Sequence, residues 1–131
     1  MPNTNGAILT VVKATSSGGP VEEETLPFNA PFDVVVEAEA GANVFNTAGA
    51  YKVQMVLTDR TTSTTVVVQN IPGNFQDGNW PTQARQLRFP VPAPGPGAED
   101  HVFQAFAVLQ VGKADPIVDF EEGQIFVITH A

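Results

Sequence analysis

Hydrophobic and polar residues alternate along the segment 32–40, FDVVVEAEA. Successive side chains of a β-strand point to opposite faces, so this period of two predicts a strand with one buried and one solvent-facing side. Phe32, Val34 and Val36 would face the core. Asp33 and Glu37, together with Glu39, are expected to be solubilising charges on the outer side rather than a catalytic set.

The same kind of pattern recurs along the chain between glycine and proline residues, and no segment shows the helical period of 3.6. The almost continuous apolar run VFQAFAVLQV favours a central strand covered on both faces, and Pro90 suits either an edge strand or the end of a strand. The long segments 41–50, 70–85 and 112–123 are predicted to be loops. Besides 32–40, strands are predicted at 7–13, 51–59, 65–69, 86–91, 102–111 and 124–129.

Composition narrows the class of protein and its partners. The 131 residues, 43% of them hydrophobic, predict a single domain over 1–131, with a flexible start at 1–6 and a flexible connector at 16–31. The net charge of -8, without a cluster of lysine and arginine, disfavours nucleic acid and membrane partners. There is no cysteine, and no signal peptide is recognised, so the cytoplasm is slightly favoured while the compartment stays open.

Seven short strands in this order resemble the immunoglobulin-like and fibronectin type III-like β-sandwich superfamily, in a cysteine-free form. The resemblance covers nearly the whole chain and implies an all-β fold, a single sandwich of about seven antiparallel strands in the order A, B, C, C′, E, F, G. The chain lacks the cysteine pair of true immunoglobulin domains, and its one tryptophan, Trp80, falls in a loop. This points to the wider class of cysteine-free bacterial or viral sandwiches, with a jelly roll or small open barrel as the alternative.

Counting strand reversals in this topology places the three long loops at one end of the sandwich, where variable immunoglobulin domains carry their binding loops. Large apolar side chains in these loops would form an exposed rim able to bind a partner. The alternative is that they fold back and cap the core. The predicted rim residues are Val44, Phe45, Phe75, Trp80, Ile117, Val118 and Phe120.

Metal chemistry has weak support in the sequence. Oxygen-bearing side chains near the same rim could in principle hold calcium, but no D-x-D-x-D-G loop is present, and Asp77-Gly78-Asn79 is better explained as a turn. The run Glu22 to Glu24 is expected to be a solvated loop, and His101 and His130 lack zinc-ligand spacing. We therefore expect no metal and no cofactor. The rim residues considered for calcium are Asn43, Asn46, Asn74, Asp77, Asn79, Asp115, Asp119, Glu121 and Glu122.

No catalytic constellation is visible either. The serines Ser16, Ser17 and Ser63 lie outside any G-x-S-x-G setting, and there is no glycine-rich phosphate loop. The sequence predicts a non-enzymatic interaction module that binds a protein partner, or its own copies, through the loop rim or an exposed strand edge. One alternative is a structural or decoration subunit of a phage-like or secretion-apparatus-like assembly, with residues 1–30 ordering on a neighbour. Another is a carbohydrate-binding or calcium-dependent adhesion module that uses Trp80 as a stacking platform.

Overall fold

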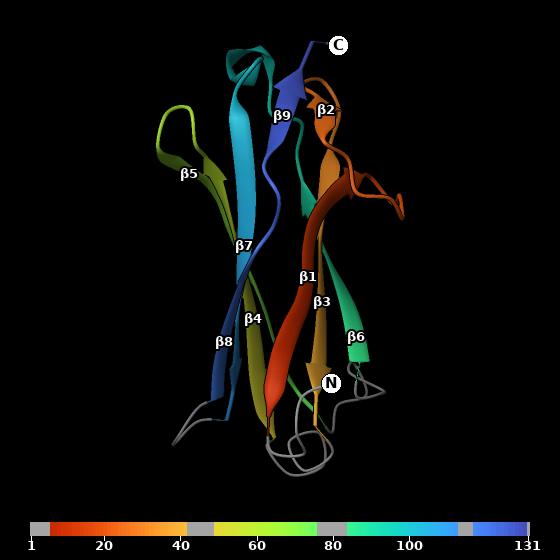
Figure 1. Cartoon of the computed structure of the whole chain (residues 1–131), viewed down its shortest axis with the longest axis vertical. Coiled ribbons are helices and arrows are strands. Elements are labelled where there is room, and N and C mark those ends of the chain that lie inside the picture. Colours follow the sequence, from red (N-terminus) through yellow and green to blue (C-terminus); the bar gives the residue numbers. More distant parts are fainter. Residues whose placement is uncertain (1–5, 42–48, 76–83, 113–116, 131) are drawn as a thin grey trace.

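Two β-sheets packed face to face make up the part of the chain that the computed structural model describes, residues 6–41, 49–75, 84–112 and 117–130 (Figure 1). A single turn of 3-10 helix, η1, covers Pro96–Ala98. The strands are β1 Ala7–Ser16, β2 Thr25–Pro27, β3 Phe32–Ala40, β4 Ala50–Asp59, β5 Thr64–Asn74, β6 Ala84–Val91, β7 Val102–Val111, β8 Ile117–Glu122 and β9 Phe126–Thr129. The described residues contain no helix with the length and hydrophobicity of a membrane span.

The all-β fold predicted from the alternation is confirmed. β3 and β7 have the bounds predicted for them, and β1, β4, β5 and β6 extend their predictions by one or more residues. The predicted loops and the predicted connector contain strand residues. In the segment 70–85, expected to be a loop, residues 70–74 belong to β5 and residues 84–85 to β6. The segment 112–123, expected to be a loop, contains β8, because IVDFEE alternates and pairs with β7. The segment 16–31, expected to be a connector, contains β2, which pairs in parallel with β9 in an otherwise antiparallel fold.

The smaller sheet has the order β1-β3-β6, and the larger has the order β2-β9-β7-β4-β5. β8 and β9 pair with successive parts of one edge of β7, residues 106–111 and 102–103. Gly123 lies at the break between them and donates its N–H to the carbonyl oxygen of Ala105 at 2.9 Å. A Cβ at this position would come within 2.7 Å of the Val12 carbonyl oxygen on β1. The break therefore requires glycine.

The core lies between the sheets and is filled by every second side chain of the long strands. Phe126 holds its centre, with its ring 5.5 Å from that of Phe32 and 5.9 Å from that of Phe103, both edge to face. This geometry is favourable for aromatic pairs and joins the two sheets, because Phe32 belongs to the smaller sheet and Phe103 to the larger.

The outer side of β3 is less exposed than its alternation predicts. Asp33 is buried and bonded to Arg88 on β6, with 2.9 Å between Oδ2 and Nη1. Val35 is also fully buried, since its register neighbours Lys13 and Arg88 stand on either side of it with long aliphatic stems. The expectation that Asp33 only solubilises the sheet was wrong.

The outer side of β7 is more exposed than the sequence predicts. Its inner residues are buried, but its outer residues, including Phe106 and Val108, stay half-buried. The prediction of a strand covered on both faces was thus wrong for the single chain. β7 is nevertheless central, as predicted, because β4 pairs along one edge and β8 and β9 along the other.

The remaining edges determine which surfaces are open. β1 and β8 approach each other where the two sheets meet, and the Leu9 N–H donates to the Asp119 carboxylate at 2.7 Å. β6, which carries Pro90, forms one edge of the smaller sheet, which is one of the two predicted positions. In the larger sheet, β5 forms the edge opposite to β2, and its residues 64–74 carry no charged side chain.

Candidate functional site

The strand ends that flank the three long connections meet at one end of the sandwich, as the strand count predicts (Figure 1). Backbone hydrogen bonds tie these ends together: Gly41 donates to Gly6, Phe75 to Gly49, and Gly112 to Ala50, each at 2.8 Å. This end positions the beginning of β4, β6 and β8, and β8 contains three of the predicted rim residues, Ile117, Val118 and Phe120.

The predicted rim residues do not form one surface in the structure. Phe75 is buried, with its ring 5.0 Å from that of Tyr51, so it caps the core. The prediction that Phe75 lies on an exposed rim was therefore wrong. Val118 and Phe120 are exposed, but they lie on the outer face of β8 rather than on a loop. Ile117 begins β8, although its side chain lies outside the description. Val44, Phe45 and Trp80 also lie outside the described residues.

Val118 and Phe120 belong instead to an apolar area on the outer face of the larger sheet. The strand register places Val56 on β4 between Val68 on β5 and Phe106 on β7, and places Val108 on β7 beside Phe120 on β8. Apolar side chains therefore continue across four adjacent strands. We call this surface the outer patch, and its residues are Val56, Val66, Val68, Phe106, Val108, Val118 and Phe120.

The outer patch is open to solvent at both of its sides. On β8, Val118 is 60% exposed and Phe120 50% exposed, and on β5 Val68 is 50% exposed. The Phe106 and Phe120 rings pack against each other in a tilted arrangement with 5.4 Å between their centroids. The middle of the patch is half-buried by its own neighbours. Single exposed hydrophobic residues are ordinary, whereas continuous apolar surfaces are uncommon on single chains.

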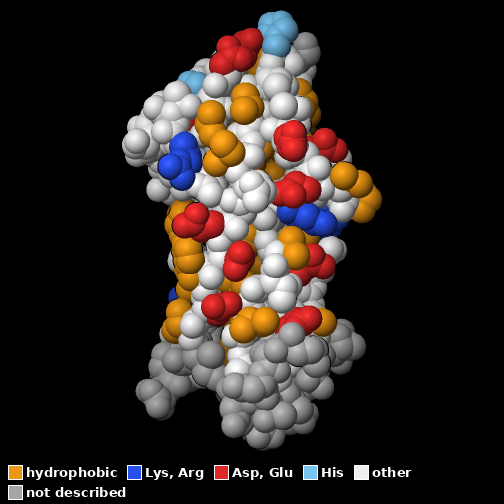
Figure 2. All heavy atoms as spheres, viewed as in Figure 1, with side chains coloured by type: hydrophobic (Ala, Val, Ile, Leu, Met, Phe, Trp, Pro, Cys, Tyr) orange, Lys and Arg blue, Asp and Glu red, His pale blue; other side chains and the backbone are white. Residues whose placement is uncertain are grey.

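Charge is distributed unevenly around the molecule. On the outer face of the larger sheet, among described residues of β4, β5, β7 and β8 and the turn after β4, the charged side chains are Lys52, Arg60 and Glu122. Acidic side chains are instead scattered over the front of the molecule in Figure 2, where a column of hydrophobic side chains follows the left edge. The outer patch is therefore almost neutral in a chain of net charge -8.

A shallow hollow of about 380 Å³ adjoins the outer patch. The Arg60 guanidinium donates to the Gln104 side-chain oxygen at 2.6 Å, and the Gln104 amide donates to the Gly123 carbonyl oxygen at 2.8 Å. Phe106 and Phe120 supply an aromatic wall. These polar groups hold one another in place around an apolar surface.

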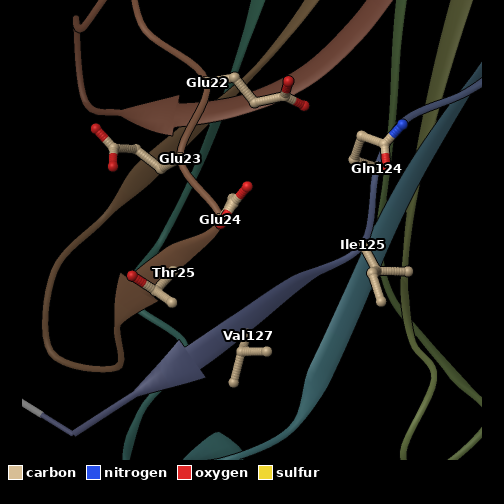
Figure 3. Close-up of a pocket in the computed structure, with 7 residues that line it drawn as sticks. All are labelled: Glu22, Glu23, Glu24, Thr25, Gln124, Ile125 and Val127. Carbon is tan, nitrogen blue, oxygen red and sulfur yellow. The ribbon is translucent and has the colours of Figure 1, made fainter.

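A second hollow, of about 450 Å³, lies between the acidic run Glu22 to Glu24 and the residues Gln124 and Ile125, which join β8 to β9 (Figure 3). Glu22 extends toward Gln124, whereas Glu23 points to the opposite side, so the carboxylates do not converge on a common point. Among the described residues, no group of three or more acidic, histidine or cysteine side chains is placed to hold a metal ion. Of the rim residues considered for calcium, Asn43, Asn46, Asp77, Asn79 and Asp115 lie outside the description.

The two histidines pair with carboxylates near strand ends. His130 bonds Glu99 at the surface, and His101 Nδ1 lies 2.6 Å from the Asp59 carboxylate. Burial raises the pKa of Asp59, but hydrogen bonds from His101 and from the Thr61 and Thr62 N–H groups, with the charge of His101, outweigh it and leave the pKa below its ordinary value. The pair fixes the turn after β4.

Sequence reasoning missed the β4, β5 and β7 residues of the outer patch. Val56 and Val68 lie at strand positions whose parity places them on the outer face, but parity alone does not tell which strands are neighbours. The alternation of Val118 and Phe120 with Asp119 and Glu121 was the available signal that β8 is a strand.

No protein-family model matches the sequence, and no curated protein sequence matches it. Solved structures do share its fold. The C-terminal domain of Wzt has a TM-score of 0.58 at 11% identity, over 98% of this chain and 75% of that one. A putative β-galactosidase from Bacteroides fragilis has a TM-score of 0.54 at 14% identity, over 91% of this chain but 17% of that one.

A third structure, the sporulation control protein Spo0M from Bacillus subtilis, has a TM-score of 0.47 at 11% identity, over 93% of this chain and 51% of that one. At these identities the similarity extends to the fold alone. The chain is an all-β sandwich domain with two mostly antiparallel sheets.

Proposed function

We propose that this chain is a non-enzymatic interaction module that binds a protein through the outer patch. We also propose that it is an immunoglobulin-like sandwich. With β1, β3, β4, β5, β6 and β7 matched to strands A, B, C, C′, E and F, and β8–β9 to strand G, the sheets are A-B-E and G-F-C-C′. A fourth strand added beside G-F-C is a known variant of that architecture.

The observation that carries the proposal is the continuity of apolar side chains across β5, β4, β7 and β8 on a face that the described residues leave partly exposed. Phe120 and Phe106 are the natural anchors, since buried aromatic side chains contribute most of the binding energy in many interfaces. Lys52, Arg60 and Glu122 would form the polar border that such interfaces have.

A site-specific photo-crosslinking experiment tests this function. A photoreactive residue replaces Val118 in the outer patch, and the matched control carries it at Val21, which is 63% exposed and lies in the connector after β1. We expect a cross-linked protein, identified by mass spectrometry, from position 118 and not from position 21.

The same experiment is repeated with Phe120→Glu added to the chain labelled at position 118. The added charge lies in the apolar contact, so the adduct should fall at least tenfold. Equal labelling from positions 118 and 21, or an adduct unaffected by Phe120→Glu, would contradict the proposal.

A second candidate function is the binding of a sugar in the 380 Å³ hollow beside Phe120. It is favoured by the aromatic wall next to polar groups already fixed by Arg60–Gln104 and Gln104–Gly123 hydrogen bonds, a combination typical of small-ligand sites. A panel of glycans should then raise the melting temperature of the chain, and Gln104→Ala should abolish that rise. The absence of a shift with every glycan would remove this candidate.

A further inference from the structure

We infer that the protein bound by the outer patch is a second copy of this chain, which packs its own outer patch against the first in a two-fold symmetric dimer. This inference rests on the proposed function, because it identifies the partner of the same surface. The interface would be a sheet-on-sheet contact in which both copies use the same residues.

The distribution of charge favours a second copy. Two chains of net charge -8 repel each other wherever their acidic surfaces meet. On the described outer face of β4, β5, β7 and β8 this repulsion is small, because Lys52, and Arg60 in the turn after β4, stand against Glu122 alone. Because it carries both signs, Glu122 of one copy has cationic partners available at the border of the other.

The sequence of β7 gives an independent argument. VFQAFAVLQV has the near-continuous apolar composition of a strand buried on both sides, yet the single chain buries only one side of it. Phe106 and Val108 are the large apolar residues in the middle of the outer side that stay half-buried. A second outer patch laid on this strand supplies the missing cover, and it does so with apolar side chains of the same kind.

The size of the face suits a reversible dimer. β7 is ten residues long, and four strands contribute to the face. With a rise of about 3.4 Å per residue and about 4.8 Å between strands, the face measures roughly 34 by 19 Å, or about 650 Å². Stable interfaces use about 800 Å² per partner, so the expected contact lies at the small end of that range.

The test uses two charge variants of the full chain. Val118→Glu/Phe120→Glu places negative charges in the outer patch, and Val118→Lys/Phe120→Lys places positive charges there. Both positions are exposed in the single chain, so folding should be retained, which circular dichroism checks. In sedimentation equilibrium up to about 0.2 mM, which covers micromolar affinities, wild type should approach twice the chain mass of 13.9 kDa.

Each charge variant alone should sediment as a monomer, while an equimolar mixture should recover the doubled mass because opposite charges then meet. Recovery in the mixture requires β8 of one copy to lie near β8 of the other, whereas loss of the dimer in each variant alone does not. Val21→Glu is the control and should dimerise like wild type. Higher salt should strengthen the wild-type dimer by screening the repulsion between acidic chains.

A wild-type chain that stays monomeric over this range overturns the inference, and so does a dimer that both charge variants retain. The proposed function fails separately. If the wild type is monomeric but position 118 still cross-links to a different protein in a manner abolished by Phe120→Glu, only the identity of the partner is wrong. If neither contact exists, the outer patch is not an interaction site.

Discussion

Asp33 shows how a residue from an apparently solvent-facing position becomes part of the structure. Its carboxylate accepts hydrogen bonds from Arg88 and from the Gly18 N–H, both at 2.9 Å. Arg88 also donates to the Gly19 carbonyl oxygen at 2.6 Å. One ion pair thus joins β3, β6 and the turn after β1. A buried carboxylate of this kind is costly only when its partner is removed.

Replacing Arg88 with methionine should therefore lower the free energy of unfolding by about 2 kcal/mol. This is below the 3–5 kcal/mol typical of fully buried pairs, because the Arg88 side chain is 31% exposed. Urea denaturation measures the loss. In a double-mutant cycle, adding Asp33→Asn should cost less than it does in the wild type, and additive losses would show that the two side chains do not interact.

Asp59 gives a pH-dependent contribution. Its pKa in the folded chain is below the ordinary value of 3.8, so between these two pKa values the unfolded chain binds more protons. The stability that Asp59 provides is complete above pH 3.8 and is lost as the pH falls through the lowered pKa.

Asp59→Asn should cost about 1 kcal/mol at neutral pH, since the amide keeps an acceptor for the Thr61 and Thr62 N–H groups but loses the charge. The difference from wild type should shrink below pH 3.8. Urea titrations at several pH values check this, and a difference that stays constant with pH would contradict it.

At the scale of elements, Gly123 allows one continuous edge of β7 to serve two strands. Its missing side chain leaves room for the carbonyl oxygens of Val12 and Ala105, which a Cβ would approach to 2.7 and 3.3 Å. The neighbours are backbone atoms of two sheets and cannot turn aside. β1 would have to move away from β7 to accommodate any larger residue.

Gly123→Ala should accordingly destabilise the chain by about 2 kcal/mol, as overpacking does elsewhere. Gly97→Ala is the matched control, because nothing lies within 4 Å of a Cβ at that position, and it should change stability by less than about 0.5 kcal/mol. Thermal and urea denaturation compare the two variants. Equal stabilities would mean that the strands separate easily at this point.

The elements show what the sequence could and could not predict. The period of two located β3 to the residue, and the near-continuous apolar run located β7 to the residue. The alternation of Val118 and Phe120 with Asp119 is short and lies between Pro116 and Gly123, residues typical of loops, so the local pattern does not distinguish β8 from a loop. Phe75 looked like a loop anchor, but its burial depends on Tyr51, a contact between distant strands. The outer patch requires strand neighbours that no local pattern specifies.

At the scale of the whole molecule, dimerisation links stability to concentration. If folded chains associate through the outer patch and unfolded chains do not, the melting temperature rises with the amount of protein. For a domain of this length we expect a rise of about 2 °C for each tenfold increase in concentration.

Val118→Glu/Phe120→Glu should remove this dependence while leaving the melting temperature of dilute protein nearly unchanged. Differential scanning calorimetry over two decades of concentration measures both. A slope shared by wild type and variant would show that the association uses another surface, and Val21→Glu should retain the wild-type slope.

The bond between the Leu9 N–H and the Asp119 carboxylate spans 110 positions of the chain. During synthesis β1 can pair with β3 early, but its other edge has to wait until Asp119 has left the ribosome. Contacts of such long range slow folding and leave strand edges exposed in the meantime. The nascent chain should consequently depend on protection of β1 during synthesis, and aggregation should begin there when translation stops before residue 119.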